Sequence, residues 1–208
     1  MKNIKLKYGL IVIALIQISL MKCASTKIVS QVNPEFIGHS FTTVLVYANF
    51  NLLNHRKLAE KELCAELTKK IGCKCFKSLD VFFPGQTFSS KQISERLIKL
   101  KIEGIVIIQP LKSGVSSIHV PGSTYTTTTA DIFGNTITGS SSTYTTPGYK
   151  INKPWSNYEA MLWSVKDSKV AWYATESSKG NGFANWDDLI KSATHKTVKN
   201  LSSSSIFR

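Results

Sequence analysis

Residues 105–111 read Ile-Val-Ile-Ile-Gln-Pro-Leu, an almost continuously apolar run. Such a run is typical of a strand that is covered on both faces of a sheet. A second β-branched and apolar run lies earlier in the chain, at 42–50 (TTVLVYANF). Helical patterns separate the two runs, and parallel strands need such crossovers. The chain is therefore predicted to be a small α/β domain with a mixed, three-layer-like sheet, an α+β arrangement being the alternative.

Two helices and one further strand are predicted between these runs. A helix over 54–71 has its apolar stripe at four-residue spacing and ends at Gly72. Residues 73–81 then read as a strand. The next helix begins at Ser89, with Gln92 placed as its capping-box partner, and ends by Gly104.

The C-terminal part of the chain predicts a hairpin followed by a helix. Residues 158–165 and 170–176 flank Lys-Asp-Ser-Lys, a turn sequence. The helix over 186–201 begins with acidic residues and ends with basic ones, as the helix dipole favours. The element order is then β-α-β-α-β-(arm)-β-β-α, the domain spans 41–201, and residues 202–208 are predicted to form a frayed tail.

The arm is the segment 113–149, which is rich in Ser, Thr and Gly and almost free of charge. It contains the similar stretches Ser-Thr-Tyr-Thr-Thr at 123–127 and 142–146. A two-residue turn at Gly134-Asn135 would pair residues whose numbers add up to 269. Tyr125 would then face Tyr144, and Gly122 would face Pro147. We predict a projecting two-stranded arm; the alternative is a disordered low-complexity loop.

The N-terminus reads as an export signal. Basic residues at 2, 5 and 7 precede the apolar segment 8–21, which is too short to span a membrane. The order Leu20-Met21-Lys22-Cys23 resembles a bacterial lipobox, although Lys22 departs from its usual small residue. We therefore predict a signal peptide at 1–22, lipid attachment at Cys23 and a polar tether at 23–40. Ordinary cleavage near Ala24, which would give a soluble secreted protein, is the alternative.

Composition and charge narrow the function classes. The 208 residues are 42% apolar and include ten Phe and four Trp, which argues against wholesale disorder. A polytopic membrane protein is excluded, because only one segment is apolar enough to enter a bilayer. Loss of residues 1–22 removes four lysines and leaves 22 basic and 13 acidic side chains, a formal charge of +9. Export separates this charge from nucleic acid, so solubility, or attraction to anionic lipid or envelope polymers, explains it better.

The cysteines do not predict a disulfide framework. Beyond Cys23, the chain has Cys64, Cys73 and Cys75. A zinc site that uses these cysteines with His55 would depart from the usual spacing of paired ligands. We expect Cys64 to pack on its helix and the other two to share a strand face. One disulfide from Cys64 to Cys73 or Cys75 stays open.

No catalytic, cofactor or metal motif is recognised in the sequence. The histidines at 39, 55, 119 and 195 fall on different predicted elements, and the acids at 60, 62 and 66 are interpreted as a solvated helix face. His55 and Arg56 begin a helix, where an anion could bind, but solvent exposure is the simpler interpretation.

The order of elements resembles bacterial envelope lipoproteins with an α/β domain like the amino-terminal domain of TolB. This group includes the curli secretion lipoprotein CsgG and the penicillin-binding-protein activator LpoB. The resemblance rests on VLVYANF (44–50), the helix with Arg56, Leu63 and Leu67, the strand from Gly104 to Ile108, and the hairpin with Tyr158 and Trp172. It implies a role in binding or assembly. The arm lies where a pore-forming member carries a membrane-inserting hairpin, but it lacks an alternating apolar face.

The sequence thus predicts a lipid-anchored, non-catalytic binding or assembly module of the bacterial cell envelope, at the outer membrane and facing the periplasm. Its expected partners are the membrane and an envelope protein or cell-wall component. An exported soluble hydrolase with an unrecognised active site is the alternative.

Overall fold

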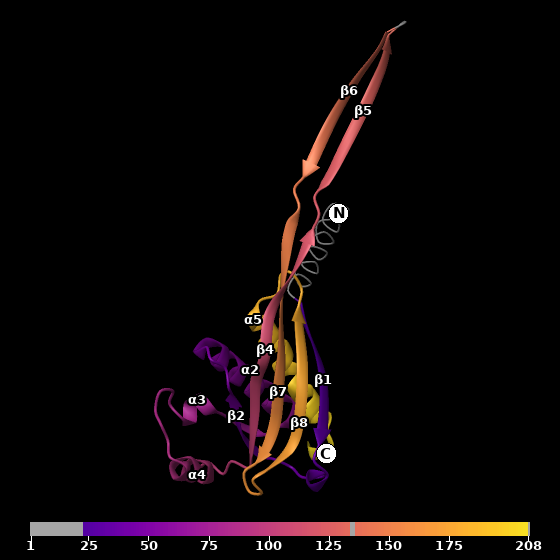
Figure 1. Ribbon diagram of the computed structural model, residues 1–208. Coiled ribbons are helices and arrows are strands. Elements are labelled where there is room, and N and C mark those ends of the chain that lie inside the picture. Colours follow the sequence, from indigo (N-terminus) through magenta and orange to yellow (C-terminus); the bar gives the residue numbers. More distant parts are fainter. Residues whose placement is uncertain (1–22, 134–135, 208) are drawn as a thin grey trace, which may run out of the picture.

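The computed structural model describes residues 23–133 and 136–207 (Figure 1). Its centre is a mixed six-stranded sheet in the order β1-β8-β7-β4-β2-β3. The strands β2, β3 and β4 are parallel, and the other neighbours are antiparallel. The predicted α/β class is confirmed. The strand bounds are Ala24–Val32 (β1), Thr43–Ala48 (β2), Lys74–Lys77 (β3), Gly104–Val120 (β4), Tyr149–Ser164 (β7) and Lys169–Gly180 (β8).

Two long helices cover one face of the sheet. These are α2 (Leu53–Ile71) and α5 (Trp186–Ser203), and their apolar side chains form the main core with alternate sheet residues. On the other face, a smaller apolar cluster joins Leu45 of β2 to Leu97 of the helix α4 (Ser90–Lys99). The three-layer arrangement is therefore local to β2 and its neighbours, and Tyr173 of β8 is exposed on the open face.

Local sequence signals explain where the helices begin and end. Ser89 caps α4 as predicted: its hydroxyl accepts the Gln92 N–H, and the Gln92 side chain accepts the Ser89 N–H. Asn185 and Asp188 form the same reciprocal box at the start of α5. Gly72 ends α2 in the left-handed conformation, at φ 78°, which suits glycine.

Residues 24–32 form a strand, so the prediction of a tether over 23–40 was wrong for this stretch. Strand β1 pairs with β8 over its whole length, and Ile28 and Val32 pack against the main core. After β1, a short 3-10 helix, η1 (Pro34–Phe36), buries Phe36. The stretch lacks a strong apolar pattern because an edge strand with one covered face needs few apolar side chains.

Two further boundaries differ from prediction. The expected strand over 73–81 ends at Lys77, and a short helix, α3 (Ser78–Val81), follows it. The predicted frayed tail is ordered: α5 continues to Ser203, and a 3-10 helix, η2 (Ser205–Phe207), follows. Ile206 is 0% exposed in the main core, and the Ser205 carbonyl accepts the Gly38 N–H. Burial of one apolar side chain therefore fixes this end.

The predicted arm is present as a second, two-stranded sheet (Figure 1). Strands β5 (Ser123–Phe133) and β6 (Thr136–Thr146) pair with positions summing to 269, so Tyr125 faces Tyr144 as predicted. The expected turn at Gly134-Asn135 lies outside the described residues. The predicted pairing of Gly122 with Pro147 falls in a break of the ladder between the two sheets. A Cβ at Gly122 would lie 2.5 Å from the Thr146 carbonyl oxygen, which explains the glycine.

None of the described helices is long and apolar enough to cross a membrane.

Candidate functional site

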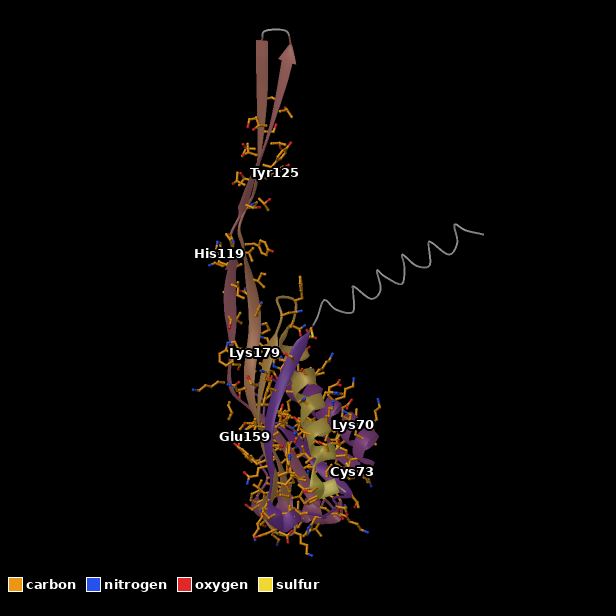
Figure 2. The ribbon with its side chains drawn as sticks, turned by 90° about the vertical axis from the view of Figure 1, so that its right-hand side faces the viewer. Lys70, Cys73, His119, Tyr125, Glu159 and Lys179 are labelled. Carbon is orange, nitrogen blue, oxygen red and sulfur yellow. A yellow bond between two sulfur atoms is a disulfide. The ribbon has the colours of Figure 1, made fainter. Side chains whose placement is uncertain are left out.

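Cys23 is the first described residue, and it lies directly against the folded domain. Its carbonyl oxygen accepts the Asn181 N–H at 3.0 Å, and β1 begins at the next residue. Its thiol is free and exposed. The start of β1 lies at the end of the domain from which the arm projects (Figures 1 and 2). The predicted signal peptide, residues 1–22, lies outside the described residues.

The arm itself presents polar and aromatic side chains to solvent. Tyr125 and Tyr144 are each 64% exposed on neighbouring strands, and Thr126 and Thr129 bond across the ladder to Thr143 and Ser140. Figure 2 shows the side chains around Tyr125 far from the domain. In the described part of the chain, neither β5 nor β6 pairs with any strand but the other. Each strand therefore leaves one edge open for hydrogen bonding.

The two-stranded part of the structure begins within the domain, before the arm strands β5 and β6. Strand β8 stops pairing with β7 at Trp155, and β2 stops pairing with β4 at Ile108. Beyond Trp155, β4 and β7 pair with each other and with no other described strand, and they continue in the arm's register to the pair Val120–Tyr149. At about 3.3 Å per residue, the two-stranded part from 115 to 133 is about 60 Å long.

Two of the four histidines line cavities beside a carboxylate. His55 Nε2 lies 3.7 Å from Asp187 Oδ1, on a cavity of about 270 Å³ that Ser113 and Ser156 also line. His195 Nδ1 lies 3.3 Å from Glu66 Oε2, on a cavity of about 480 Å³ between α2, α5 and the start of β1. Among the described contacts, neither imidazole bonds to a hydroxyl or a thiol, so no nucleophile–base pair is formed.

The other two histidines are separate from these pairs. His39 lies against the Phe36 ring, with the ring centroids 5.2 Å apart, and His119 is exposed near the base of the arm (Figure 2). The four histidines therefore do not converge on one site.

The cysteines of the domain differ from the favoured prediction. Cys64 of α2 forms a disulfide with Cys75 of β3, one of the two pairings left open, with Cα atoms 5.4 Å apart. Cys73 is free and buried, and burial raises the pKa of its thiol. The disulfide uses two of the cysteines that a metal site would need. Within the described residues, no group of three His, Cys, Asp or Glu side chains is placed to hold a metal ion.

Glu60 is completely buried, so its assignment to a solvated helix face was wrong. Its Oε1 accepts hydrogen bonds from Arg56 Nε (3.1 Å) and the Ser78 hydroxyl (2.6 Å). Its Oε2 accepts the Leu79 N–H in the first turn of α3. The carboxylate thus connects α2 to the start of α3. Arg56 is occupied by this network and by the Tyr47 ring, and is not the exposed anion ligand that was considered.

A second buried carboxylate, Glu176 of β8, lies beneath α5. Its Oε1 accepts the Thr197 hydroxyl, and its Oε2 has no hydrogen-bond partner within the described chain. Burial raises the pKa of Glu176 to about 7, although Thr197 and the charge of Lys196 oppose the shift. Glu176 is also the register partner of Tyr158, another buried polar side chain.

Basic side chains gather along the outer side of β1 and α5. A groove of about 430 Å³ between these elements is lined by Lys27, Lys196 and Lys199, together with Thr26 and Asn200. Thr26 and Lys196 also line the cavity that contains Cys23. The sequence does not reveal this cluster, because Lys27 is distant from Lys196 and Lys199 along the chain.

No family model matches the chain, and no curated protein matches its sequence. Among solved structures, the fold is similar to a PelC dodecamer from Paraburkholderia phytofirmans, with a TM-score of 0.51 and 10% identity over 86% of this chain and 99% of that one. This likeness shows the fold alone.

Two weaker structural matches accompany it. A variant of the same PelC dodecamer gives a TM-score of 0.48 at 10% identity, over 85% of this chain and 97% of that one. A PDZ domain protein from Parabacteroides distasonis gives 0.36 at 10% identity, over 90% of this chain and 38% of that one.

Proposed function

We propose that the protein is a lipid-anchored, non-catalytic assembly module of the bacterial cell envelope, in which the arms of neighbouring copies pair edge to edge. The observation that carries the proposal is the isolated two-stranded sheet β5–β6, whose outer edges are open in the described chain. A two-stranded ribbon is marginally stable alone in water, and pairing with further strands removes this weakness.

The arm also lacks the usual devices that prevent edge pairing. Natural edge strands are protected by lysine, proline, bulges or covering segments. Residues 122–146 contain no lysine, arginine or proline, and Asp131 is their one charged residue. The described register of β5 and β6 runs without a bulge. Such an edge can accept an identical arm, because the backbone groups of a second copy complement it.

Two likenesses support an assembling protein. The PelC structure, whose fold is similar, is a dodecamer. The envelope lipoproteins that the sequence resembles act by binding or assembly. Cys23, exposed at the start of β1, is the proposed attachment point to the outer membrane, and multiple acyl chains at one cysteine give durable anchoring.

Removing residues 123–146 is expected to reduce the assembled protein to a monomer. The deletion leaves Pro121, Gly122, Pro147 and Gly148 between Val120 and Tyr149, which are paired, so the domain's ladder is kept. The mass of detergent-solubilised protein, measured by light scattering on a sizing column, reports the result.

A matched variant separates backbone edges from side chains. Tyr125→Ser with Tyr144→Ser leaves both edges in place and is expected to keep the assembled mass. Equal masses for the intact chain and the deletion variant would overturn arm-mediated assembly. Loss of assembly in the tyrosine variant alone would assign the contact to the aromatic rings instead.

The mature protein recovered from membranes is expected to begin at Cys23 and to carry added acyl mass. Intact-mass spectrometry tests this beside Cys23→Ala, which removes the acceptor sulfur and is expected to leave the chain unacylated. An unmodified start near Thr26, with the protein in the soluble fraction, would contradict lipid anchoring and favour a secreted protein.

A second candidate, an exported hydrolase, is favoured by the His55–Asp187 pair on a cavity that also holds Ser113 and Ser156. A fluorophosphonate probe that labels one of these serines, and fails to label the His55→Gln variant, would support this activity. Labelling that is unaffected by His55→Gln would rule out a hydrolase site that uses His55.

A further inference from the structure

The groove between β1 and α5 has the composition of an anion site. Three of its lining residues, Lys27, Lys196 and Lys199, are lysines, and among the described residues that line it none is acidic. None of these lysines takes part in a described ion pair. The nearby acids lie elsewhere: Glu176 is buried beneath α5, and Glu62, Glu66 and Asp188 line the adjoining cavity, which Lys196 also lines. The ammonium groups are therefore free to neutralise an external anion.

The fold holds these lysines in one place. Lys196 and Lys199 lie one turn apart on α5, and α5 packs against β1 and β8. Lys27 comes from β1, which hydroxyl contacts of Thr26 join to both neighbours: its oxygen lies 2.8 Å from that of Ser192 on α5 and 2.7 Å from that of Ser178 on β8. The three lysines thus line one groove because of tertiary structure, and not because they belong to one flexible basic segment.

The position of the groove indicates the source of the anion. Thr26 and Lys196 are shared between this groove and the cavity that contains Cys23. Along α5, Lys191 extends the basic side chains into this cavity, which Glu62, Glu66 and Asp188 also line; the acids lie on the cavity and not on the groove. The groove therefore adjoins the cavity that Cys23 lines, and it lies near any membrane to which Cys23 is attached.

We propose that this groove binds the phosphate of an anionic phospholipid headgroup and so holds the β1–α5 side of the domain against the membrane. Lysine side chains attract anionic lipid surfaces over short distances. The side chains of Asn200 and Thr26, which also line the groove, add polar groups that can bond to phosphate oxygens or to the headgroup. The proposal goes beyond assembly through the arm. Its choice of a lipid headgroup rests on the proposed anchor at Cys23, whereas binding of the anion by the groove does not require acylation.

Vesicle binding of an unacylated chain tests the groove. The chain without residues 1–22 and with Cys23→Ala is suitable, because every described element and the whole core lie after Cys23. Vesicles of phosphatidylglycerol mixed with phosphatidylcholine are expected to bind it, and pure phosphatidylcholine vesicles are not. Lys196→Gln with Lys199→Gln is expected to weaken binding about thirtyfold, since each lysine near an anionic surface contributes about 1 kcal/mol.

A control with the same change of net charge makes the result specific. Lys91→Gln with Lys99→Gln removes two exposed lysines from α4, which packs on the opposite side of the sheet. This pair is expected to leave vesicle binding within about twofold, because charges beyond a Debye length are screened. If the two double variants weaken vesicle binding equally, net charge alone accounts for the attraction, and the proposal of a headgroup site in the groove is overturned.

The source of the phosphate is separated by competition. Inorganic phosphate is added to the vesicle-bound chain, with sodium chloride of matched ionic strength as the comparison. Equal release by the two salts is expected for a headgroup site on a membrane surface. Release by phosphate well before chloride would make the groove a soluble-phosphate site and overturn the lipid assignment. Because the chain tested carries no acyl group, these results do not depend on whether Cys23 is acylated.

Discussion

Replacing Glu60 with alanine is expected to lower the free energy of unfolding by about 3–5 kcal/mol, the range for breaking a buried ion pair. The carboxylate is 0% exposed and binds Arg56, Ser78 and the Leu79 N–H. It also accepts the Ala48 N–H at the end of β2, at 3.3 Å. Without it, the guanidinium loses its counter-charge, and the Ala48 and Leu79 N–H groups lose their acceptor.

The measurement is urea denaturation followed by circular dichroism, with Glu95→Ala as the control. Glu95 is exposed on α4 and takes part in no described ion pair, so its removal is expected to change stability by no more than about 0.5 kcal/mol. Glu60→Gln separates the effect of the charge from that of hydrogen bonding, because it keeps an oxygen acceptor and loses the charge. A loss below about 1 kcal/mol for Glu60→Ala would mean that the network contributes little net stability.

The sequence contained a signal for Glu60. The spacing Glu60, Leu63, Leu67 places the carboxylate on the same helical stripe as two core residues, and Arg56 precedes it by one turn. The charge of Glu60 alone suggested a solvent-exposed face, whereas its position on the apolar stripe of the helix indicated burial. A charged residue within an apolar stripe is therefore better interpreted as a buried, partnered group.

Patterns with a local cause were predictable from the sequence. The capping box of Ser89 and the arm's register, which follows from symmetry about Gly134-Asn135, both depend on neighbouring residues. Strand β1 was not predicted, because its identity as a strand comes from β8, far along the chain. The Cys64–Cys75 pairing and the grouping of Lys27 with Lys196 have the same origin. Each requires tertiary placement of distant segments, which periodicity does not contain.

Replacing Glu176 with glutamine is expected to stabilise the protein at alkaline pH and to remove a pH dependence. Burial raises the pKa of Glu176 to about 7 in the folded chain, from its ordinary value of 4.5. The unfolded chain releases this proton more readily, so folding favours the protonated form. The stability that depends on protonated Glu176 is complete below about pH 4.5 and is lost as the pH rises through about 7. The difference in pKa corresponds to about 3 kcal/mol.

Glutamine imitates the protonated acid, since it keeps an oxygen for the Thr197 hydroxyl and carries no charge. Urea denaturation at pH 5 and pH 8 is expected to show a gain of about 3 kcal/mol for Glu176→Gln at the higher pH only. Glu62→Gln on α2 is the control for loss of an acidic charge. All other titratable groups are the same in the variant and in the unmodified chain, so the difference between the two reports on Glu176. An equal effect at the two pH values would mean that Glu176 is ionised within the folded protein throughout, with its Oε2 satisfied by water.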